Sequence, residues 1–437
     1  MRPLRIAIGP SAEKIIFEWL CIGIVYSFFF WTLLNSICCI SLFAAWLLIC
    51  GKSFNFSSAR TRLIFLFACL YLASLTGIFY TSNTSEGLSR LQEKVPILIF
   101  PLIFGTTGLL TTRLVNKITF HFVIGAAISA LSSICYGLWQ YTRTGLIESI
   151  TARNLQVFPD SYPYLLGLSS LLAIILMLTG TVSVSTSRKW LQLCIISILS
   201  LHIILLGTRV IIACWAIVIL IGVIAGIGTL LKRVLALVLL ACTTALLITA
   251  IPTLRRQWKE FTDPPEKTTI PLDRDGSLGT SWGGKSIREA IWKCSGDLVR
   301  HHWLAGVGTG DIQDSLQQAY ENRKFYFASR YNRYNAHSQY LQTLLGHGVG
   351  GLAILILCII LPLGGLLIHI RALPSLQTCY LAFLCLFCAL CFTEVILDVN
   401  KGVILYAFFN SVFAFASPLH KLKINPDSIP HGKSTIG

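Results

Sequence analysis

Long apolar runs cover most of this chain, and one long polar segment interrupts them at residues 251–348. A window of about 19 residues picks out about twelve apolar spans. Each span should be an α-helix, because lipid offers no partner for an unpaired backbone polar group. The predicted spans lie near residues 15–31, 33–50, 63–80, 95–112, 118–140, 161–182, 190–207, 210–230, 234–251, 349–370, 376–397 and 401–417.

The composition supports a membrane protein. Of the 437 residues, 54% are hydrophobic and only 12% are charged, whereas soluble domains carry roughly 25% charged residues. One globular core cannot hide this much apolar surface, so the bilayer must act as the solvent. The predicted fold class is therefore an all-α polytopic membrane protein with a large, mainly helical outer loop.

Basic residues in the short loops predict the orientation. Every even-numbered span is followed by basic residues, and both termini are basic, so both termini should face the cytoplasm. The polar segment and the loop at 141–160 then face outward. The residues concerned are Arg2, Arg5, Lys14, Lys52, Arg60, Arg62, Arg113, Lys117, Arg188, Lys189, Lys232, Arg233, Arg371, Lys421, Lys423 and Lys433.

This topology divides the chain into four parts: spans one to nine at 1–251, an outer loop carrying the site at 252–348, spans ten to twelve at 349–417, and a cytoplasmic tail at 418–437. The basic residues of the cytoplasmic loops and termini, which set the topology, account for much of the +16 net charge. The outer loop mixes both signs of charge and has no basic stripe, which argues against nucleic-acid binding. Its single cysteine, Cys294, excludes a disulfide within that loop.

The outer loop shows two helical patterns. Ile287, Ile291, Cys294 and Leu298 recur on one face of a helix predicted over 286–304, with Arg288 beside that face. Asp311 is the expected N-cap of a second helix near 311–323. The glycine-rich stretch 306–310 lies between the two helices.

Two motifs of the outer loop invite a metal or phosphate interpretation. Gly306-Val-Gly-Thr-Gly310 lacks the Gly-Lys-Ser/Thr ending of a phosphate loop, so a turn between helices is favoured. Asp273 and Asp275 lack the remaining ligands of a calcium loop, so a polar turn is favoured there. No zinc spacing is present, and the sequence predicts a site without metal or cofactor.

Arginines then become the candidate anion binders. Arg209 places a permanent charge between two apolar spans, where it should pair with an anion or reach the lipid headgroups. A guanidinium suits phosphate because it donates two parallel hydrogen bonds and keeps its charge. The same predicted side of the membrane carries four more candidates, namely Arg153, Arg288, Arg330 and Arg333.

His337 is the candidate base. It precedes a helical repeat that leads toward span ten, and a hydrated imidazole, which ordinarily titrates near pH ~6.5, suits proton abstraction from a hydroxyl. A capping or interfacial role is the alternative. His347 in a glycine-rich bend, and His301 and His302 in the loop, are weaker candidates.

Three acids lie in or beside the apolar spans. Glu18 follows Lys14 by one helical turn and should pair with it. Glu394 and Asp398 lie one turn apart near Lys401. They are expected either to form a local salt bridge or to orient an arginine or the histidine of the site.

The motifs of residues 205–352 resemble those of the O-antigen ligase/polymerase superfamily. The long polar segment before the last three spans is also similar, although Ser338 stands where the family often has asparagine. The matching motifs are Gly207-Thr-Arg209, Ser286-Ile-Arg288, Trp303-Leu-Ala-Gly-Val-Gly-Thr-Gly310, Asn335-Ala-His337-Ser-Gln-Tyr-Leu341 and Gly348-Val-Gly-Gly-Leu352.

This resemblance implies a GT-C type glycosyltransferase, expected to invert, in the bacterial inner membrane with its site on the periplasmic side. It implies His337 as general base and Arg209 and Arg288 as pyrophosphate ligands. Its partners would be undecaprenyl-pyrophosphate-linked O-antigen, lipid A–core oligosaccharide and membrane lipids. Further candidates for substrate contact are Arg153, Arg330, Arg333, Asn335 and Tyr340.

Two other hypotheses stay open beside a ligase. The first is an O-antigen polymerase or a protein oligosaccharyltransferase of the same superfamily. The second is a transporter for lipid-linked sugars, which should show polar residues at mid-membrane and repeated, broken helices. In this chain the candidate residues gather at one predicted face of the membrane, which favours a transferase.

We predict that reporter fusions at residue 300 and at the C-terminus will report opposite sides of the membrane. The fusion at 300 should be active only outside the cytoplasm, because every even-numbered span ends in basic residues. Reporter activity and protease access would be compared for the two fusions. A cytoplasmic signal at residue 300 would contradict the predicted topology.

Overall fold

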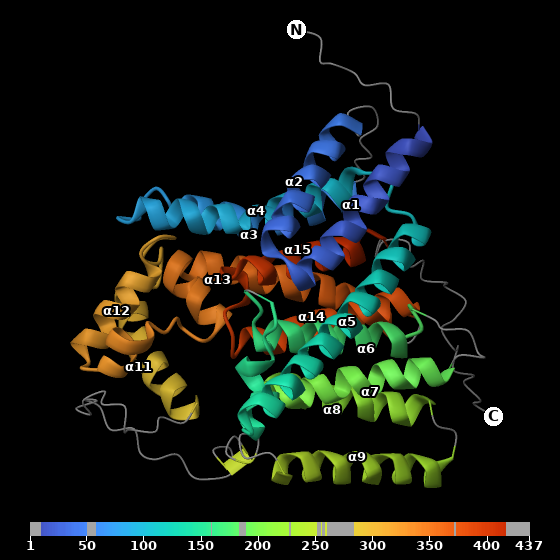
Figure 1. The fold of residues 1–437 in the computed structure, drawn as a ribbon. Helices are drawn as coiled ribbons and strands as arrows, with labels where there is room; N and C mark the ends of the chain where they lie inside the picture. The colour runs from blue at the N-terminus through green and yellow to red at the C-terminus, as the bar shows by residue number, and fades with distance from the viewer. Residues whose placement is uncertain are drawn as a thin grey trace, which may run out of the picture.

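The fold is a bundle of α-helices. The computed structural model describes residues 10–49, 58–158, 160–182, 189–226, 229–250, 255, 258–259, 284–370 and 373–416, and these contain no β-strand. The helices are α1 (Pro10–Phe30), α2 (Thr32–Ile49), α3 (Ser58–Thr76), α4 (Thr84–Thr106), α5 (Thr112–Thr144), α6 (Pro163–Leu178), α7 (Lys189–Leu206), α8 (Arg209–Gly226), α9 (Leu230–Ala250), α11 (Gly284–His302), α12 (Ile312–Asn322), α13 (Gln339–Leu367), α14 (Ser375–Cys391) and α15 (Asn400–Ala416) (Figure 1).

Six of these helices are long and apolar enough to cross a membrane: α3, α5, α7, α8, α9 and α13. Three shorter apolar helices lie within α2, α6 and α14. Each predicted span overlaps one helix of the structure. The all-helical fold class is thus confirmed, whereas the count of twelve spans, the side on which each end lies and the domain bounds stay predictions.

Helices α6 and α15 lie at the centre of the bundle. Both are covered on all sides, since residues 165–177 of α6 and 401–415 of α15 are all buried. Aromatic rings fill the space around α15: Phe408 packs edge-on against Phe100 of α4 with 5.3 Å between ring centroids, and Phe409 packs against Phe122 of α5 at 4.6 Å. This core ties helices from both ends of the sequence together.

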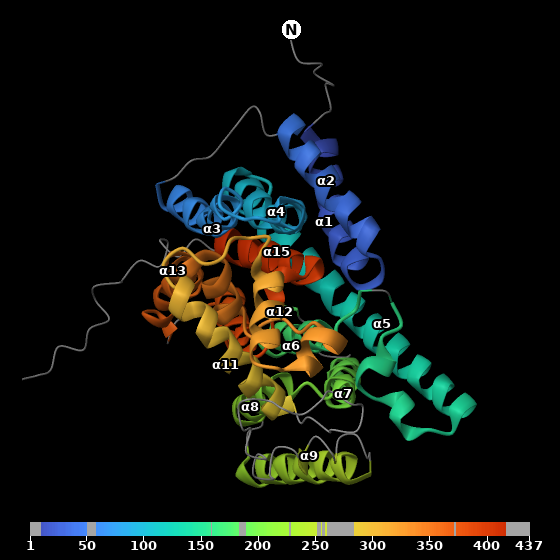
Figure 2. The ribbon, with the colours of Figure 1, turned by 90° about the vertical axis from the view of Figure 1, so that its left-hand side faces the viewer.

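The polar segment has a small core of its own. Helices α11 and α12 are strongly amphipathic and bury Ala290, Ile291 and Leu316 against each other, as the predicted apolar face requires. Arg323, just after α12, holds Asp297 of α11 through two hydrogen bonds of 2.5 and 2.8 Å. Figure 2 shows α11 and α12 together in front of the bundle, beside the start of α13.

The glycine-rich stretch 306–310 is a turn that packs on α13. Its Val307 N–H donates to the Leu345 carbonyl at 2.8 Å. In return, Val349 N–H donates to the Trp303 carbonyl at 2.8 Å. This exchange is possible because α13 bends at Gly348, whose φ is 61° and ψ −164°. The preference for a turn over a phosphate loop is therefore consistent with the structure.

Of two sequence predictions about carboxylates, the N-cap position of Asp311 is confirmed, whereas the partner of Glu18 was wrong. Asp311 stands before α12, but its carboxylate does not cap that helix; it accepts from the N–H groups of Ser82 and Asn83 at 2.6 and 2.7 Å, before α4. Glu18 pairs with Lys117 of α5 and not with Lys14. In both cases a residue distant in sequence is a better-placed partner than the helical neighbour, which periodicity cannot show.

We predict that Gly348→Ala will destabilise the protein, while Gly350→Ala will not. A Cβ at Gly348 would overlap the Leu304 carbonyl, and its positive φ disfavours alanine by about 1–2 kcal/mol. Gly350 has no other atom within 4 Å of such a Cβ. The measurement is the melting temperature of each purified variant in detergent. Equal melting temperatures would contradict the described bend.

Candidate functional site

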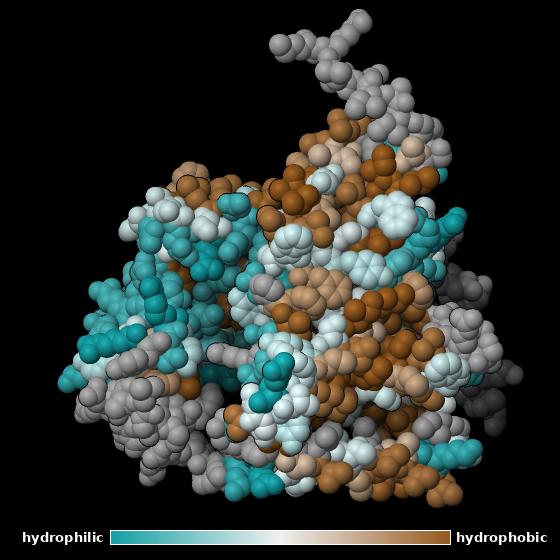
Figure 3. All heavy atoms as spheres, in the orientation of Figure 1, coloured by the Kyte–Doolittle hydropathy of each residue, from teal (hydrophilic) through white to brown (hydrophobic). Residues whose placement is uncertain are grey.

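Polar side chains gather at one end of the bundle. Figure 3 shows hydrophilic residues gathered around α12 at one end of the bundle and hydrophobic residues over much of the rest of this face. The loop after α3 joins this polar end, because Tyr80 donates from its hydroxyl to the Ala305 carbonyl at 2.6 Å. The end of α14 also joins it, through a 3.3 Å hydrogen bond from Ser338 to the Cys391 carbonyl. The site is thus assembled from segments far apart in sequence.

Arg288 lies on α11 and faces the loop between α14 and α15. Its Nη2 lies 3.2 Å from the Glu394 carboxylate and 3.4 Å from the Thr393 carbonyl. The side chains of Arg288 and Glu394 are 29% and 17% exposed, so water reaches both only in part. Glu394 thus contacts an arginine, as one of its two expected roles requires, and its part in the site stays a prediction.

Glu394 lies outside the spanning helices, because α14 ends at Cys391 and the predicted span to residue 397 is too long. Burial raises the pKa of Glu394 to about 7, although the Arg288 guanidinium acts in the opposite direction. A carboxyl group with this pKa is protonated in part of the molecules near neutral pH. Arg288 is then free to bind another anion without displacing a fixed negative charge.

Asp398 lies at the other end of the same loop, in η7 (Ile396–Asp398). Its Oδ1 lies 2.9 Å from the ammonium of Lys94, on α4, and its Oδ2 accepts from Gln342 at 2.7 Å. Burial acts to raise the pKa of Asp398, but Lys94, Arg90 and the Gln342 hydrogen bond together hold that pKa below its usual value. This carboxylate is therefore a fixed charge.

His337 immediately precedes the N-cap of α13, where its φ is 45°. A residue other than glycine rarely keeps this left-handed conformation unless its neighbours enforce it. The Asn335 side chain accepts from the His337 N–H at 3.0 Å, and the Ser338 hydroxyl accepts from Leu341 N–H and caps α13. The rings of Tyr334 and His337 lie 5.4 Å apart. The expected helix after His337 is confirmed.

Arg288 and His337 lie on elements that are joined directly. Trp292, one turn after Arg288 on α11, donates from its indole N–H to the carbonyl of Ala336 at 3.1 Å. Ala336 is fully buried and precedes His337. The structure therefore places the elements of the predicted anion binder and the predicted base next to each other.

Arg209 is the first residue of α8 and is partly buried. It follows Gly207, whose φ of 69° ends α7 and lets the chain reverse direction. Both ribbon views place the start of α8 on the side of the bundle that carries α11 (Figures 1 and 2). The role of Arg209 as a pyrophosphate ligand stays a prediction.

The other predicted substrate contacts take different positions. Arg330 lies over the Tyr326 ring at 4.0 Å, and Arg333 lies 3.8 Å from Asp314. Both are mostly exposed, at 60% and 67%. Tyr340 donates to the Cys388 carbonyl at 3.1 Å and so packs α13 against α14. The backbone of Arg153 is in η3 (Ala152–Leu155), and its side chain lies outside the described part of the structure.

Sequence reasoning missed the residues of α4. Arg90 contacts Glu86 at 2.8 Å and Glu93 at 3.5 Å, and it donates to the Asp398 carbonyl at 3.1 Å. Lys94 follows one turn later. Four charges at helical spacing just before a predicted apolar span were the available signal, since such charges need partners within the protein. Gln339, Gln342 and Thr343 were a second signal, since polar residues on an otherwise apolar helix also need partners within the protein.

No three His, Cys, Asp or Glu side chains come together as a metal site in the described residues. Asp273 and Asp275 lie outside those residues. His347 is directed at Ser74, with 3.4 Å between Nε2 and the hydroxyl. His301 and His302 are exposed in the last turn of α11.

The described residues form an all-helical bundle with six long apolar helices and a polar end that holds an arginine–carboxylate pair, an arrangement typical of a multi-pass membrane protein. Residues 170–356 match the family model described as O-antigen ligase. This match covers less than half of the chain and supports the O-antigen ligase family that the motifs predicted, a family that implies a membrane glycosyltransferase-like enzyme. A search of curated proteins finds no match to the chain.

We predict that Glu394→Gln will gain stability relative to the wild type as pH rises. Because the folded-state pKa of Glu394 is about 7, above the usual value for glutamate, its stabilising contribution is complete below the usual value and is lost as pH rises through 7. Glutamine does not titrate and so does not show that loss. The difference in unfolding free energy between Glu394→Gln and the wild type should therefore change by up to about 1.4 kcal/mol per pH unit.

The measurement is the melting temperature of both proteins in detergent between pH 5 and 8, with Glu321→Gln as the control on a carboxylate that is 43% exposed. A difference between the Glu394→Gln variant and the wild type that stays constant across this range would contradict the described burial of Glu394.

Proposed function

We propose that this protein is an O-antigen ligase, which transfers O-antigen polysaccharide from undecaprenyl pyrophosphate to lipid A–core oligosaccharide. One observation carries the proposal. The segment that matches the O-antigen ligase family contains Arg209, Arg288 and His337, and Trp292 ties the helix of Arg288 to the residue before His337. A phosphate-binding cation and a base held side by side are what a glycosyl transfer from a pyrophosphate requires.

In the proposed reaction, a hydroxyl of the acceptor sugar attacks the anomeric carbon of the donor. The new glycosidic bond forms while the bond to the pyrophosphate oxygen breaks, and the bonding electrons leave with the pyrophosphate. Arg288 and Arg209 would stabilise that negative charge, as fixed cations can do without metal. His337 would accept the hydroxyl proton. Arg330, Arg333, Asn335, Tyr340 and Arg153 remain proposed contacts to the substrates.

Glu394 gives this mechanism a way to admit the donor. Its carboxyl group holds Arg288 at 3.2 Å, and its raised pKa makes protonation easy when a pyrophosphate approaches the same guanidinium. Donor binding would then replace the Glu394 carboxylate at Arg288 with the pyrophosphate, so that Arg288 does not face two anions at once. Glu394 would also be the next candidate base if His337 were not required.

The position of the site fits a donor on a lipid carrier. The polar end adjoins the apolar faces of the bundle (Figure 3), so a polyprenyl chain could stay in the bilayer while its head group reaches Arg288. We place the protein in the bacterial inner membrane with this end in the periplasm and both termini in the cytoplasm.

Deleting the gene and separating lipopolysaccharide on a gel distinguishes the family activities. A ligase mutant should lose all polymer on lipid A and accumulate polymer on the lipid carrier. A polymerase mutant would instead keep a single capped repeat, and that result would contradict the ligase assignment. Failure to find any lipid-linked repeat outside the cytoplasm would favour a transporter.

We predict that Arg288→Ala will weaken donor binding by about tenfold or more, since hydrogen bonds between charged groups contribute about 1.5–3 kcal/mol. Arg288→Lys should restore only part of the affinity, because an ammonium cannot form the two-pronged contact. Donor affinity would be measured beside transfer rate, with Arg113→Ala, an exposed arginine at the start of α5, as the control. Unchanged affinity in Arg288→Ala would exclude this arginine as a donor ligand.

We predict that His337→Ala will leave donor affinity near the wild-type value but slow transfer by ~10²–10⁴. The same two measurements apply, and His301→Ala, an exposed histidine on α11, serves as the control. A near-normal rate in His337→Ala would remove the general base from the proposed mechanism. Glu394→Gln would then be assayed as the next candidate.

A further inference from the structure

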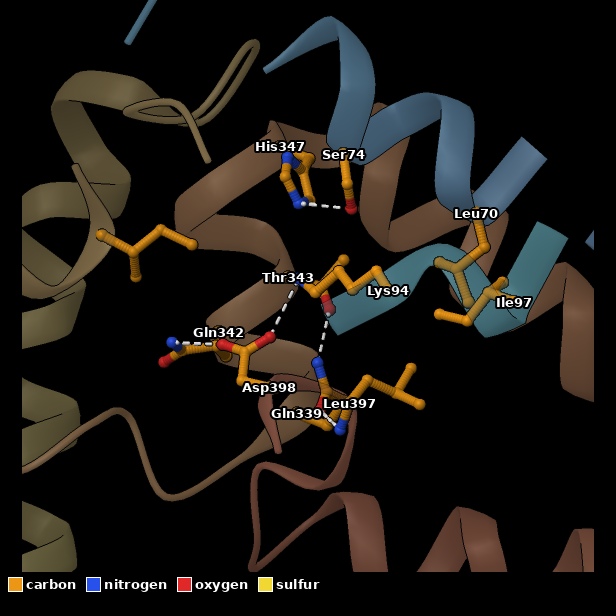
Figure 4. Close-up of a pocket in the computed structure, with 11 residues that line it drawn as sticks. Leu70, Ser74, Lys94, Ile97, Gln339, Gln342, Thr343, His347, Leu397 and Asp398 are labelled. Carbon is orange, nitrogen blue, oxygen red and sulfur yellow. Dashed lines mark hydrogen bonds and ion pairs between the residues drawn. The ribbon is translucent and has the colours of Figure 1, made fainter. Parts of the chain in front are cut away.

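A buried ion pair is connected through Gln342 to the residue before His337. Lys94 and Asp398 are 2.9 Å apart, with side chains only 8% and 10% exposed. Both line a small cavity together with Ser74, Gln342 and His347, and Figure 4 shows Lys94 and Gln342 converging on the Asp398 carboxylate. Lys94 and Asp398 both lie outside the segment 170–356 that matches the family.

The two oxygens of Asp398 have different partners. Oδ1 faces Lys94, whereas Oδ2 accepts the hydrogen bond of 2.7 Å from the Gln342 side chain. With its amide nitrogen committed to Asp398, Gln342 presents its carbonyl oxygen to the backbone N–H of Ala336, at 3.2 Å. The orientation of the Gln342 amide therefore follows from the acceptor oxygen that Asp398 presents to it.

Ala336 is held from both sides. Gln342 accepts from its N–H, and Trp292 donates to its carbonyl oxygen at 3.1 Å. The next residue is His337, with its positive φ of 45°. A backbone in this conformation persists only where its surroundings fix it. The chain of contacts from Lys94 to Ala336 provides that restraint.

Stability alone does not account for the pair. Removing two charges from water costs several kcal/mol per ion, and packed apolar side chains often stabilise a protein equally well or better. The geometry serves orientation instead, since the two carboxylate oxygens and the backbone carbonyl of Asp398 face three different side chains. Arg90 donates to its backbone carbonyl at 3.1 Å, and Gln339 accepts from Leu397 N–H at 2.7 Å.

We propose that Lys94 is a positioning residue for the transfer reaction: by neutralising Asp398 it orients Gln342, which fixes the Ala336 backbone and so the place of His337. This inference rests on the proposed transferase function. Lys94 does not touch the reacting atoms in this scheme. Its loss should therefore lower kcat and leave the donor KM nearly unchanged.

Hydrogen exchange tests the positioning step without any substrate. Lys94→Met should increase amide exchange in a peptide covering residues 334–342 by about tenfold, because the restraint on Ala336 is lost. Lys117→Met is the matched control, since it removes the ion pair between Lys117 of α5 and Glu18 of α1. It should leave exchange in that peptide unchanged. Unaltered exchange in Lys94→Met would overturn the inference whatever the protein's activity.

Activity tests the consequence. Lys94→Met should lower kcat about 10- to 100-fold, since a displacement of ~1 Å at a reacting group has that effect. Lys94→Met/Asp398→Asn should recover at least tenfold of this loss. The asparagine oxygen can still accept from Gln342, and no uncompensated charge remains buried. Lys117→Met should keep the wild-type kcat.

Two kinetic outcomes would overturn the proposal. A double variant as slow as Lys94→Met, with a raised donor KM, would make Lys94 a substrate ligand. A wild-type kcat in Lys94→Met would make the pair a structural contact only. If Lys94→Met does not fold, the double variant is measured by itself. Its kcat is then expected within about tenfold of the wild-type value, and a loss of kcat beyond about 100-fold would contradict the proposal. If the wild-type protein transfers no glycan, the proposed function is refuted. The hydrogen-exchange measurement then still decides whether Lys94 restrains the Ala336 backbone.

Discussion

The structure depends on neutralising charges at the boundary between an apolar bundle and its polar end. The loop between α14 and α15 carries two carboxylates, and each is paired with a cation from a different helix: Glu394 with Arg288 of α11, and Asp398 with Lys94 of α4. An uncompensated charge at such a place is costly. The two pairs therefore fix α4, α11 and the last loop relative to one another.

This constraint explains how a site can be assembled from distant parts of the chain. Lys94 precedes the matched family segment, Arg288 and His337 lie inside it, and Glu394 and Asp398 follow it. Gln342 and Trp292 join the outer parts to the backbone beside His337. The matched segment thus contains the predicted reacting groups, but residues on both sides of it hold them.

Sequence reasoning predicted the helices better than the contacts between them. Apolar runs and helical periodicity located α11, α12 and each spanning helix, because these signals are local. The partner expected for Glu18 was wrong, since it pairs with Lys117 of another helix, and Asp311 takes the expected N-cap position but binds the loop before α4. Arginine and histidine motifs identified Arg288 and His337, yet they could not show that Trp292 joins their elements. The sequence did not identify Lys94 as a candidate, because its importance depends on its contact with Asp398, which is distant in sequence.

A structure of the protein with a non-reactive undecaprenyl-pyrophosphate donor in a lipid nanodisc would test the central claim most directly. We expect the pyrophosphate within hydrogen-bond distance of Arg288, with Glu394 released from that guanidinium and the anomeric carbon facing the space beside His337. A donor seated away from the polar end, with the Arg288–Glu394 pair intact, would contradict this account.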